Sequence, residues 1–406
     1  MKKVLIPKRK LPWGSDHEAI VWLMVVLLVV GMVNVFSSTF ITAENENSAP
    51  YAYLLKHLIS MGIGFVLFAM SWRVDYHKWR DWLGPVALSI AALLLFVLAA
   101  GTVVNGAKRW IYLGAFSFQP AEFAKICSVM IAAYILSYRV EHKLPVNILN
   151  AQYAFIAFLF VVVEMEPDMG TACVILGIPI VMLWMAGLKT YKLQRLALVG
   201  LAAVVGMCIY QPYRLGRIKV MLDPWSDAQG MGYQTVQSVT AIGSGGFWGM
   251  GLGQGLAKYA YLPEAHTDFA FAVFCQENGF VLVALVLLLY GAFAYYAVRI
   301  ARDAYDAYGQ LLAGGIMLLV VGQAVVNIAM VAGCFPVVGV PLPFISYGGT
   351  SLMMTMFSVG VLINIGRYSR AKQAKEKLEE LRRNNLKNHE AALAAMPGRR
   401  RLQRIK

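Results

Sequence analysis

The sequence is poor in charge and in cysteine. Charged residues make up 14% of its 406 residues, against about 25% in soluble domains, which excludes an ordinary soluble fold. The five cysteines are odd in number and form no C-x-x-C pair. This pattern argues against a disulfide framework or a zinc site, so we interpret them as small buried apolar residues. Segments of strictly alternating polarity are also lacking, which excludes the strands of a membrane barrel.

Apolar residues are abundant instead. They make up 59% of the chain, and its mean hydropathy is +0.60. They gather in blocks of which most can cross roughly 30 Å of hydrocarbon as a helix; the fifth, 151–165, is short and ends beside Glu164 and Glu166. We therefore expect an all-α polytopic integral membrane protein with about ten transmembrane helices. The predicted spans are 19–40, 54–71, 83–100, 121–138, 151–165, 170–187, 193–210, 269–298, 309–333 and 350–367.

The lysines and arginines predict the orientation. Of 36 in total, 28 fall in the two termini and alternate loops, seven fall in the other loops, and Lys125 lies inside a predicted span. Because cytoplasmic loops are enriched in these residues, we expect both termini to be cytoplasmic. A large loop, 211–268, between predicted helices seven and eight then faces outward. The chain divides into a basic N-terminus (1–18), a membrane domain (19–368) and a basic tail (369–406).

The net charge of +14 is mainly a consequence of this topology. A basic tail suits anionic lipid headgroups, so membrane lipids are expected partners and nucleic acid is not. Residues 370–395 have a helical pattern of charged pairs.

Two predicted outward segments carry cations against this trend. Lys108, Arg109 and Trp110 follow the third span, and Arg214 and Arg217 lie in the large loop. Cations at the headgroup level suit a phosphate or diphosphate, which arginine engages in a bidentate manner. The alternatives are contact with outer headgroups for the two basic residues, and an ordinary interfacial aromatic for the tryptophan.

The start of the fourth span combines Gln119, Glu122 and Lys125. Gln119 precedes Pro120, and proline is common at the first position of a helix. Glu122 and Lys125 are three residues apart on one helix face and can pair. They form either a neutralised buried ion pair or the polar lining of a substrate cavity.

The end of the large loop, Tyr261–Phe269, places Glu264, His266 and Asp268 at the predicted membrane rim. Partial desolvation there raises a carboxyl pKa, so we interpret Asp268 as a general base; the alternative is a helix N-cap. Nothing fixes these side chains as metal ligands, and no dedicated metal site is predicted. A Mg²⁺ or Mn²⁺ ion that bridges a carboxylate and substrate phosphates is the cofactor we consider.

A glycine-rich segment, 242–255, precedes this rim. It has no Gly-Lys-Ser/Thr ending and is not a P-loop. We expect a re-entrant or interfacial segment.

Several motifs occur together and in order, and their combination is specific. They are Asn105-Gly106-Ala107-Lys108-Arg109-Trp110, Gln119-Pro120-Ala121-Glu122-Phe123, Glu166-Pro167-Asp168, Leu262-Pro263-Glu264-Ala265-His266-Thr267-Asp268 and Pro343-Phe344-Ile345-Ser346-Tyr347-Gly348. Over roughly residues 15–370 the chain resembles the SEDS family of FtsW, RodA and SpoVE proteins. The segments 223–234 and 251–264 are most similar to FtsW, whereas 336–341 and 349–351 look more like RodA. Glu166 and Gln276 depart from the usual pattern.

The resemblance implies a ten-helix peptidoglycan glycosyltransferase that polymerises lipid II and works with a class B penicillin-binding transpeptidase. Asp268 matches the family's proposed catalytic aspartate and would deprotonate the acceptor sugar. The expected substrate-binding residues are Lys108, Arg109, Trp110, Gln119, Glu122, Lys125, Arg214, Arg217, Glu264, His266 and Ser346.

An FtsW-like protein is expected in the bacterial inner membrane at the division septum, with other divisome proteins as partners. The alternatives are a RodA-like elongation polymerase, a lipid II flippase and a scaffold for division proteins. A polar cavity within a helical bundle would serve a flippase as well as an enzyme.

Overall fold

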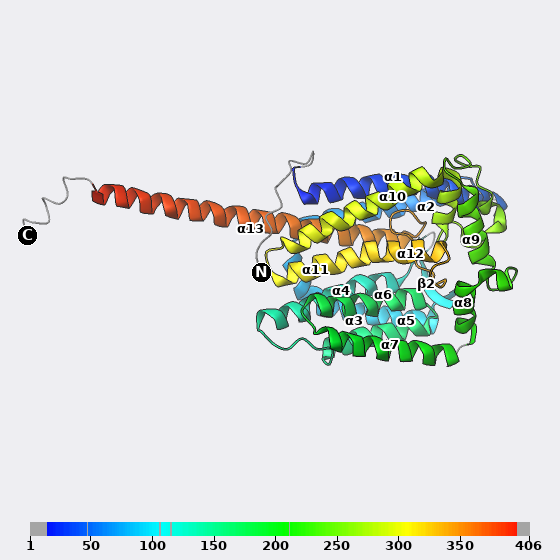
Figure 1. Ribbon diagram of the computed structural model, residues 1–406, viewed down its shortest axis with the longest axis horizontal. Coiled ribbons are helices and arrows are strands. Elements are labelled where there is room, and N and C mark those ends of the chain that lie inside the picture. The colour runs from blue at the N-terminus through cyan, green and yellow to red at the C-terminus, as the bar shows by residue number, and fades with distance from the viewer. Residues whose placement is uncertain (1–13, 47, 105–106, 114–115, 211, 396–406) are drawn as a thin grey trace, which may run out of the picture.

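The computed structural model describes residues 14–46, 48–104, 107–113, 116–210 and 212–395. Long helices run side by side along the body of the molecule, and short helices and strands gather at one end (Figure 1). We call this the loop-rich end; it holds α8, α9 and β2. Helix α1 begins, and helix α13 leaves the bundle, at the opposite end. The predicted all-α membrane fold is therefore confirmed in outline.

Every predicted span falls on a helix. The long elements are α1 (Asp16–Asn45), α2 (Ala52–Arg73), α3 (Tyr76–Ala100), α4 (Pro120–Glu141), α5 (Ala151–Met165), α6 (Met169–Met185), α7 (Thr190–Tyr210), α10 (Ala270–Arg302), α11 (Ala307–Met317), α12 (Gln323–Val331) and α13 (Gly349–Ala395). A π-helical turn, η3 (Leu318–Gly322), joins α11 to α12.

Seven helical stretches within the described residues are long and apolar enough to cross a membrane, while α5 and α6 are apolar but shorter. The predicted number of ten spans and the predicted sidedness of the termini remain predictions.

Short polar side chains cap the N-termini of several helices. Asn150 accepts a hydrogen bond from the backbone N–H of Tyr153 at the start of α5 (2.9 Å). Asp168 accepts one from the N–H of Thr171 at the start of α6 (3.1 Å). Such caps satisfy backbone donors that a helix leaves unpaired. They fix where α6 begins, and with it the position of the Asp168 carboxylate.

Helices α4 and α13 lie near the centre of the bundle. Helix α4 packs against α3, α6 and α11, and α13 packs against α2. The approach of α13 to α2 is close, because a Cβ on Gly360 would lie 2.0 Å from the Ser71 hydroxyl. That hydroxyl donates to the Phe357 carbonyl across the interface (2.9 Å). A glycine is required at this crossing.

Helix α10 is interrupted at Gly279, where φ is +68°. The glycine-rich segment packs into the break. The N–H groups of Met250 and Gly251 donate to the carbonyls of Gln276 and Glu277, each at 3.0 Å, and that of Phe280 donates to Gly246. The backbone groups freed by the break are thereby satisfied, as a membrane protein requires. The first segment of α10, which follows Asp268, is set apart from the rest of the helix.

The outward loop of the sequence analysis forms α8 (Pro212–Leu222), the 3₁₀ turn η1 (Pro224–Asp227), α9 (Tyr233–Ser244) and the π turn η2 (Ala257–Tyr261). These short helices cover the loop-rich end (Figure 1).

Three short strands precede α4, although no strand was predicted there. Strand β2 (Ala107–Leu113) pairs antiparallel with β1 (Thr102–Val104) and with β3 (Phe116–Phe118). This hairpin carries Arg109 and Trp110.

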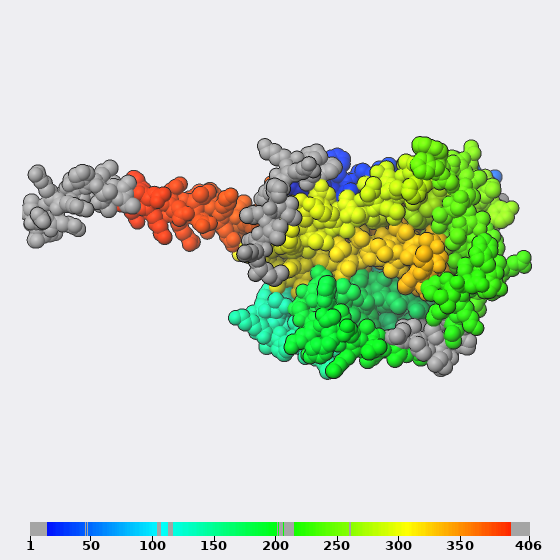
Figure 2. All heavy atoms as spheres, in the orientation of Figure 1, coloured from blue at the N-terminus to red at the C-terminus, as the bar shows by residue number. Residues whose placement is uncertain are grey.

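Helix α13 continues past the bundle as a polar helix that stands away from the body (Figure 2). This confirms the predicted helix at 370–395. The prediction that the cysteines are buried is right for Cys127 and Cys275 and wrong for Cys173 and Cys334, which are exposed. The side chain of Cys208 lies outside the described residues.

Candidate active site

A cavity of about 1460 Å³ opens at the loop-rich end. It is bounded by α2, β2, the start of α4, α6, α8, and the segments 263–269 and 335–351. Segments from the whole length of the chain therefore build one site. The volume exceeds the roughly 300–1,000 Å³ of ordinary small-ligand pockets, so the cavity suits a large substrate.

The cavity has an apolar flank. Its lining along α6 consists of Cys173, Val174, Gly177, Ile178 and Val181. Val181 is 40% exposed and Cys173 is exposed, so this flank reaches the lateral surface of the bundle. In a bilayer that surface faces lipid. A molecule with an apolar tail can thus enter from the membrane while its polar part lies among the charged residues.

Asp268 lies in the wall of this cavity. Its backbone carbonyl accepts a hydrogen bond from the Asn327 side chain (2.7 Å). Residue 269 occupies the N-cap position of α10, with no side-chain cap bond, so the alternative role of Asp268 as a helix cap is wrong. Gly339, with φ +73°, passes close by, and a Cβ there would lie 3.2 Å from the Asp268 Oδ2 atom. Among the described residues, none donates a hydrogen bond to this carboxylate.

The pKa of Asp268 is raised from 3.8 to about 7. Withdrawal from water is the main cause, and the negative charges of Glu264 and Asp168 add to it. Arg109 and Arg217 act in the opposite direction. Burial and like charges both disfavour the ionised carboxylate. The pKa of this carboxyl group therefore lies near neutral pH, which is the range that suits general acid or base catalysis.

Two arginines line the cavity beside Asp268. Arg109 on β2 donates through Nε to the carbonyl of Glu166 (3.0 Å) and through a second nitrogen to that of Pro167. Arg217 on α8 donates to the carbonyl of Val337 (2.6 Å). Each guanidinium is thus held in place by backbone oxygens. Trp110 also lines this part of the cavity.

The polar floor comes from α4 and α6. Gln119 donates to the Asp168 carboxylate (3.0 Å). Glu122 pairs with Lys125 at 2.7 Å, which confirms the pairing predicted from their spacing. Lys125 also donates to Gln323 (2.9 Å). Gln119, Glu122 and Gln323 line the cavity, whereas Lys125 supports it from behind. The pair is therefore buried, and its carboxylate member Glu122 forms part of the wall.

Glu264 lines the cavity and accepts a hydrogen bond from the Thr267 hydroxyl (2.7 Å). Its φ of +54° marks a sharp turn just before Asp268.

Three further predicted site residues lie elsewhere. Lys108 donates to the Ala99 carbonyl (3.1 Å). His266 packs edge-on against Tyr53 with a ring separation of 5.7 Å, and the Ser346 hydroxyl accepts from the backbone of Leu342 (3.0 Å). None of these three belongs to the described cavity lining. Arg214 falls in α8, but its side chain lies outside the described residues.

The structure adds Lys56, Tyr53 and Tyr347 to the cavity and places Asp168 there as well. The ammonium of Lys56 lies 5.5 Å from the centre of the Tyr53 ring. Lys56 is one of the seven cations on the predicted outward side, where its position in the sequence indicates topology alone. Asp168 belongs to the Glu166-Pro167-Asp168 turn at the outer end of the fifth predicted span, and the polar-cavity interpretation of Glu122 and Lys125 applies to it in the same way.

A second buried ion pair lies behind the site. Lys258 contacts Glu277 at 2.7 Å, and Ser37 on α1 donates to the same carboxylate (2.6 Å). The neighbouring Gln276 accepts from the N–H of Ala257 (2.9 Å) and donates to Ser244 (2.9 Å). Lys258 is thus not a surface cation, and Gln276 fastens η2 and α9 to the first segment of α10.

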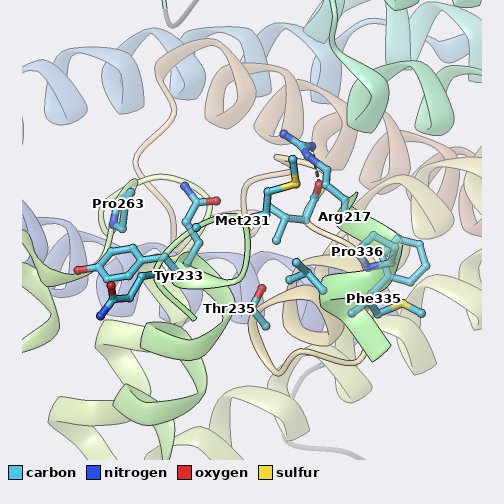
Figure 3. A pocket seen from close by; sticks show the side chains of 13 residues that line it. Arg217, Met231, Tyr233, Thr235, Pro263, Phe335 and Pro336 are labelled. Carbon is cyan, nitrogen blue, oxygen red and sulfur yellow. Dashed lines mark hydrogen bonds between the residues drawn. The ribbon is translucent and has the colours of Figure 1, made fainter. Parts of the chain in front are cut away.

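A side pocket of about 450 Å³ adjoins the cavity (Figure 3). It lies between α8, the start of α9 and the segment 335–337.

No group of three or more histidine, cysteine, aspartate or glutamate side chains suited to a metal occurs within the described part of the chain. Asp168, Glu264 and Asp268 all line the cavity, and the charges of the first two raise the pKa of Asp268.

The comparisons with known proteins identify the family. The sequence matches the family FTSW_RODA_SPOVE, described as "Cell cycle protein", over residues 18–371. The chain belongs to this family. It is 38% identical over 364 residues to "Stage V sporulation protein E" of Bacillus subtilis (strain 168), covering 88% of this chain and 98% of the relative.

A second relative, "Probable peptidoglycan glycosyltransferase FtsW" of Geobacter sp. (strain M18), is 38% identical over 355 residues, covering 86% and 97% of the two chains. The fold is also that of a chain in a solved structure entitled "Structural coordination of polymerization and crosslinking by a peptidoglycan synthase complex". The TM-score is 0.70 at 27% identity, covering 88% of this chain and 99% of the other. The expected enzyme class is thus confirmed at the level of the family.

Proposed function

We propose that this protein polymerises lipid II into glycan strands at the outer face of the bacterial cytoplasmic membrane. The observation that carries the proposal is the position of Asp268. It lies in a cavity that joins a cation-bearing polar end to an apolar flank open toward lipid. A lipid-linked sugar diphosphate has the same division into a charged headgroup and an apolar tail. The family membership supports the same substrate class.

Asp268 acts as the general base. It takes the proton of the acceptor sugar's 4-hydroxyl, whose oxygen then bonds to the anomeric carbon of the donor. The bond from that carbon to the diphosphate oxygen breaks, and undecaprenyl diphosphate leaves with the electron pair. A single displacement of this kind inverts the anomeric carbon, by the logic that applies to inverting hydrolases.

The cations stabilise the leaving group. Arg109 and Arg217 line the cavity close enough to Asp268 to influence its charge, and Lys56 adds a third cation from α2. Positive groups fixed in advance near a developing negative charge lower the barrier of the step. Because both arginines are anchored by backbone carbonyls, little reorganisation is needed. Trp110, Gln119, Glu122 and Glu264 complete the proposed substrate contacts.

A divalent cation would have to be shared between the protein and the substrate, since no group of three or more metal-ligating side chains occurs in the described part of the chain. Asp168 and Glu264 line the cavity with Asp268, and Mg²⁺ or Mn²⁺ typically binds one or two carboxylates together with substrate phosphates. When bound, such an ion would add positive charge at the diphosphate.

We further propose that a class B penicillin-binding transpeptidase is the partner and that the protein acts at the division septum with other divisome proteins. The chain matched in the peptidoglycan synthase complex supports a transpeptidase partner. The outer face of α10, with Phe280 61% and Leu288 71% exposed, offers an apolar surface for a partner helix within the membrane.

The test is a lipid II polymerisation assay on the purified chain, with and without the transpeptidase, and with Mn²⁺ or a chelator. We expect glycan polymer on a denaturing gel, more of it with the partner, and less in chelator. A parallel assay follows lipid II movement across liposome membranes. Movement without polymer under every condition would replace the enzyme with the flippase.

A further inference from the structure

The side pocket next to the main cavity has a chemistry of its own. It is lined by Gln229, Tyr233, Gln234 and Thr235 on its polar side and by residues of α8 and the segment 335–337 on its apolar side. Figure 3 shows Tyr233, Thr235, Met231 and Arg217 around the open space.

The pocket is continuous with the site of reaction. Arg217, Gln234 and Pro263 line both spaces, as do Phe335, Pro336 and Val337. Pro263 directly precedes Glu264, whose charge raises the pKa of Asp268. A ligand group in the side pocket is therefore a neighbour of the group undergoing reaction.

The residues that line the side pocket are poorly suited to two parts of a lipid-linked substrate, its diphosphate and its polyprenyl tail. Among the described lining residues, Arg217 is the one charged side chain, and a diphosphate needs more positive charge than this to leave water. The amides and hydroxyls would be left unsatisfied by a polyprenyl tail. A sugar unit fits better, because its hydroxyl and acetamido groups pair with neutral donors and acceptors. The volume of about 450 Å³ lies within the range of small-ligand pockets.

The pocket opens on the outer surface and has fixed walls. At its rim, Met231 is 55% exposed and Phe335 42% exposed. The turn that carries Met231 is held by Asp227, whose carboxylate accepts from the N–H of Met231 (2.9 Å). The opposite wall is held by the Arg217 bond to Val337 (2.6 Å). A pocket formed in advance binds a ligand at a lower entropic cost.

We propose that the side pocket holds sugars of the growing glycan strand next to the reaction centre. The proposal rests on the proposed function, because it assigns a subsite for the product of that reaction. A strand held here stays attached while a spent lipid carrier leaves and a new lipid II enters through the apolar flank. The open rim lets the strand extend outward as it lengthens. The pocket therefore sets how many units are added before release.

The first test fills the pocket. Met231→Trp places an indole at the rim, and Leu222→Trp is the matched control, because Leu222 lies on the neighbouring α8, is 76% exposed and is outside the lining. Strand lengths are measured on products of lipid II polymerisation. We expect Met231→Trp to give strands about tenfold shorter, equivalent to about 1.4 kcal/mol of strand binding, with a much smaller fall in initial rate. Leu222→Trp should match the wild type.

The second test does not depend on catalysis. Binding of a β-1,4-linked tetramer of N-acetylglucosamine is measured by saturation-transfer NMR on the same proteins. We expect binding to the wild type and to Leu222→Trp, and its loss in Met231→Trp. Gln229→Ala, which removes an amide without adding bulk, should weaken binding and shorten strands if Met231→Trp fails to fold.

The outcomes separate the two proposals. Strands of wild-type length from a folded Met231→Trp protein, or tetramer binding indifferent to both pocket variants, would overturn the subsite and leave the polymerase intact. A wild-type protein that binds the tetramer through Met231 and Gln229 but makes no polymer would overturn the polymerase and leave the subsite.

Discussion

The pH dependence of polymerisation should report the ionisation of Asp268. With a pKa of about 7, the carboxyl group is about 9% ionised at pH 6 and about 91% ionised at pH 8. If the ionised form is the base, the rate should rise about tenfold over this range. An aspartate with the ordinary pKa of 3.8 would be ionised throughout and would give a flat profile.

Two variants should move the midpoint of this profile in opposite directions. The charge of Glu264 raises the pKa of Asp268 and that of Arg217 lowers it. Glu264→Gln should therefore shift the midpoint to lower pH, and Arg217→Gln should shift it to higher pH. The glutamine at 264 keeps an oxygen that can accept the Thr267 hydrogen bond, so the turn before Asp268 should survive.

The assay measures initial rates of lipid II polymerisation between about pH 5 and pH 9, at matched protein and partner concentrations. The midpoint is compared rather than the absolute rate, because both variants also alter substrate contacts. A flat wild-type profile, or shifts of the same sign in the two variants, would refute the assignment of this pKa to the base.

Three stability predictions follow from buried groups and can be measured by thermal unfolding in detergent. Lys125→Met leaves Glu122 without its 2.7 Å partner and should lower the free energy of unfolding by about 3–5 kcal/mol. The double variant with Glu122→Gln should recover most of this loss. No recovery in the double variant would show that the ion pair is not the cause. Burial raises the pKa of Glu166 from 4.5 in the unfolded protein to about 8 in the folded protein. The carboxyl group therefore loses its proton at a lower pH when the protein is unfolded, and the free energy of unfolding falls as the pH rises between these two values. Glu166→Gln should remove that fall and add roughly 2–4 kcal/mol at pH 8; an unchanged pH slope would contradict this cause. Gly279→Ala places a Cβ 2.2 Å from the Gly249 nitrogen at a φ of +68° and should cost at least about 2 kcal/mol, unlike an alanine at Gly291, where the space is open.

The helices could be predicted because their signal is local. Seven of the apolar stretches in the described residues are long enough to cross a bilayer, and this holds whatever the neighbouring helices do. The pairing of Glu122 with Lys125 was predictable for the same reason, since helical geometry alone brings residues three apart together. The place of Asp268 between a polar loop and an apolar run predicts a position at the membrane rim, while its position in the wall of a cavity comes from the structure.

The remaining features depend on contacts between distant segments. The break at Gly279 lies inside an apolar run that continues to Val298, and it exists because the glycine-rich segment packs into it. Strands of three residues such as β1 carry too few side chains to show a pattern. Lys56 belongs to the site because α2 lies beside the segment 335–351 in the folded protein, whereas Lys108 faces the Ala99 carbonyl. Lys108 and Arg109 are adjacent in the sequence, yet Arg109 lines the cavity and Lys108 does not belong to its described lining.

The most direct measurement of the central claim is the yield of glycan polymer from purified lipid II by Asp268→Asn, relative to the wild type, in the presence of the partner. Asparagine keeps the size of the side chain but is not a base at neutral pH. We expect the rate to fall by about 10²–10⁴-fold while the thermal stability and the binding of lipid II persist. Polymer formed at the wild-type rate by this variant would contradict the account.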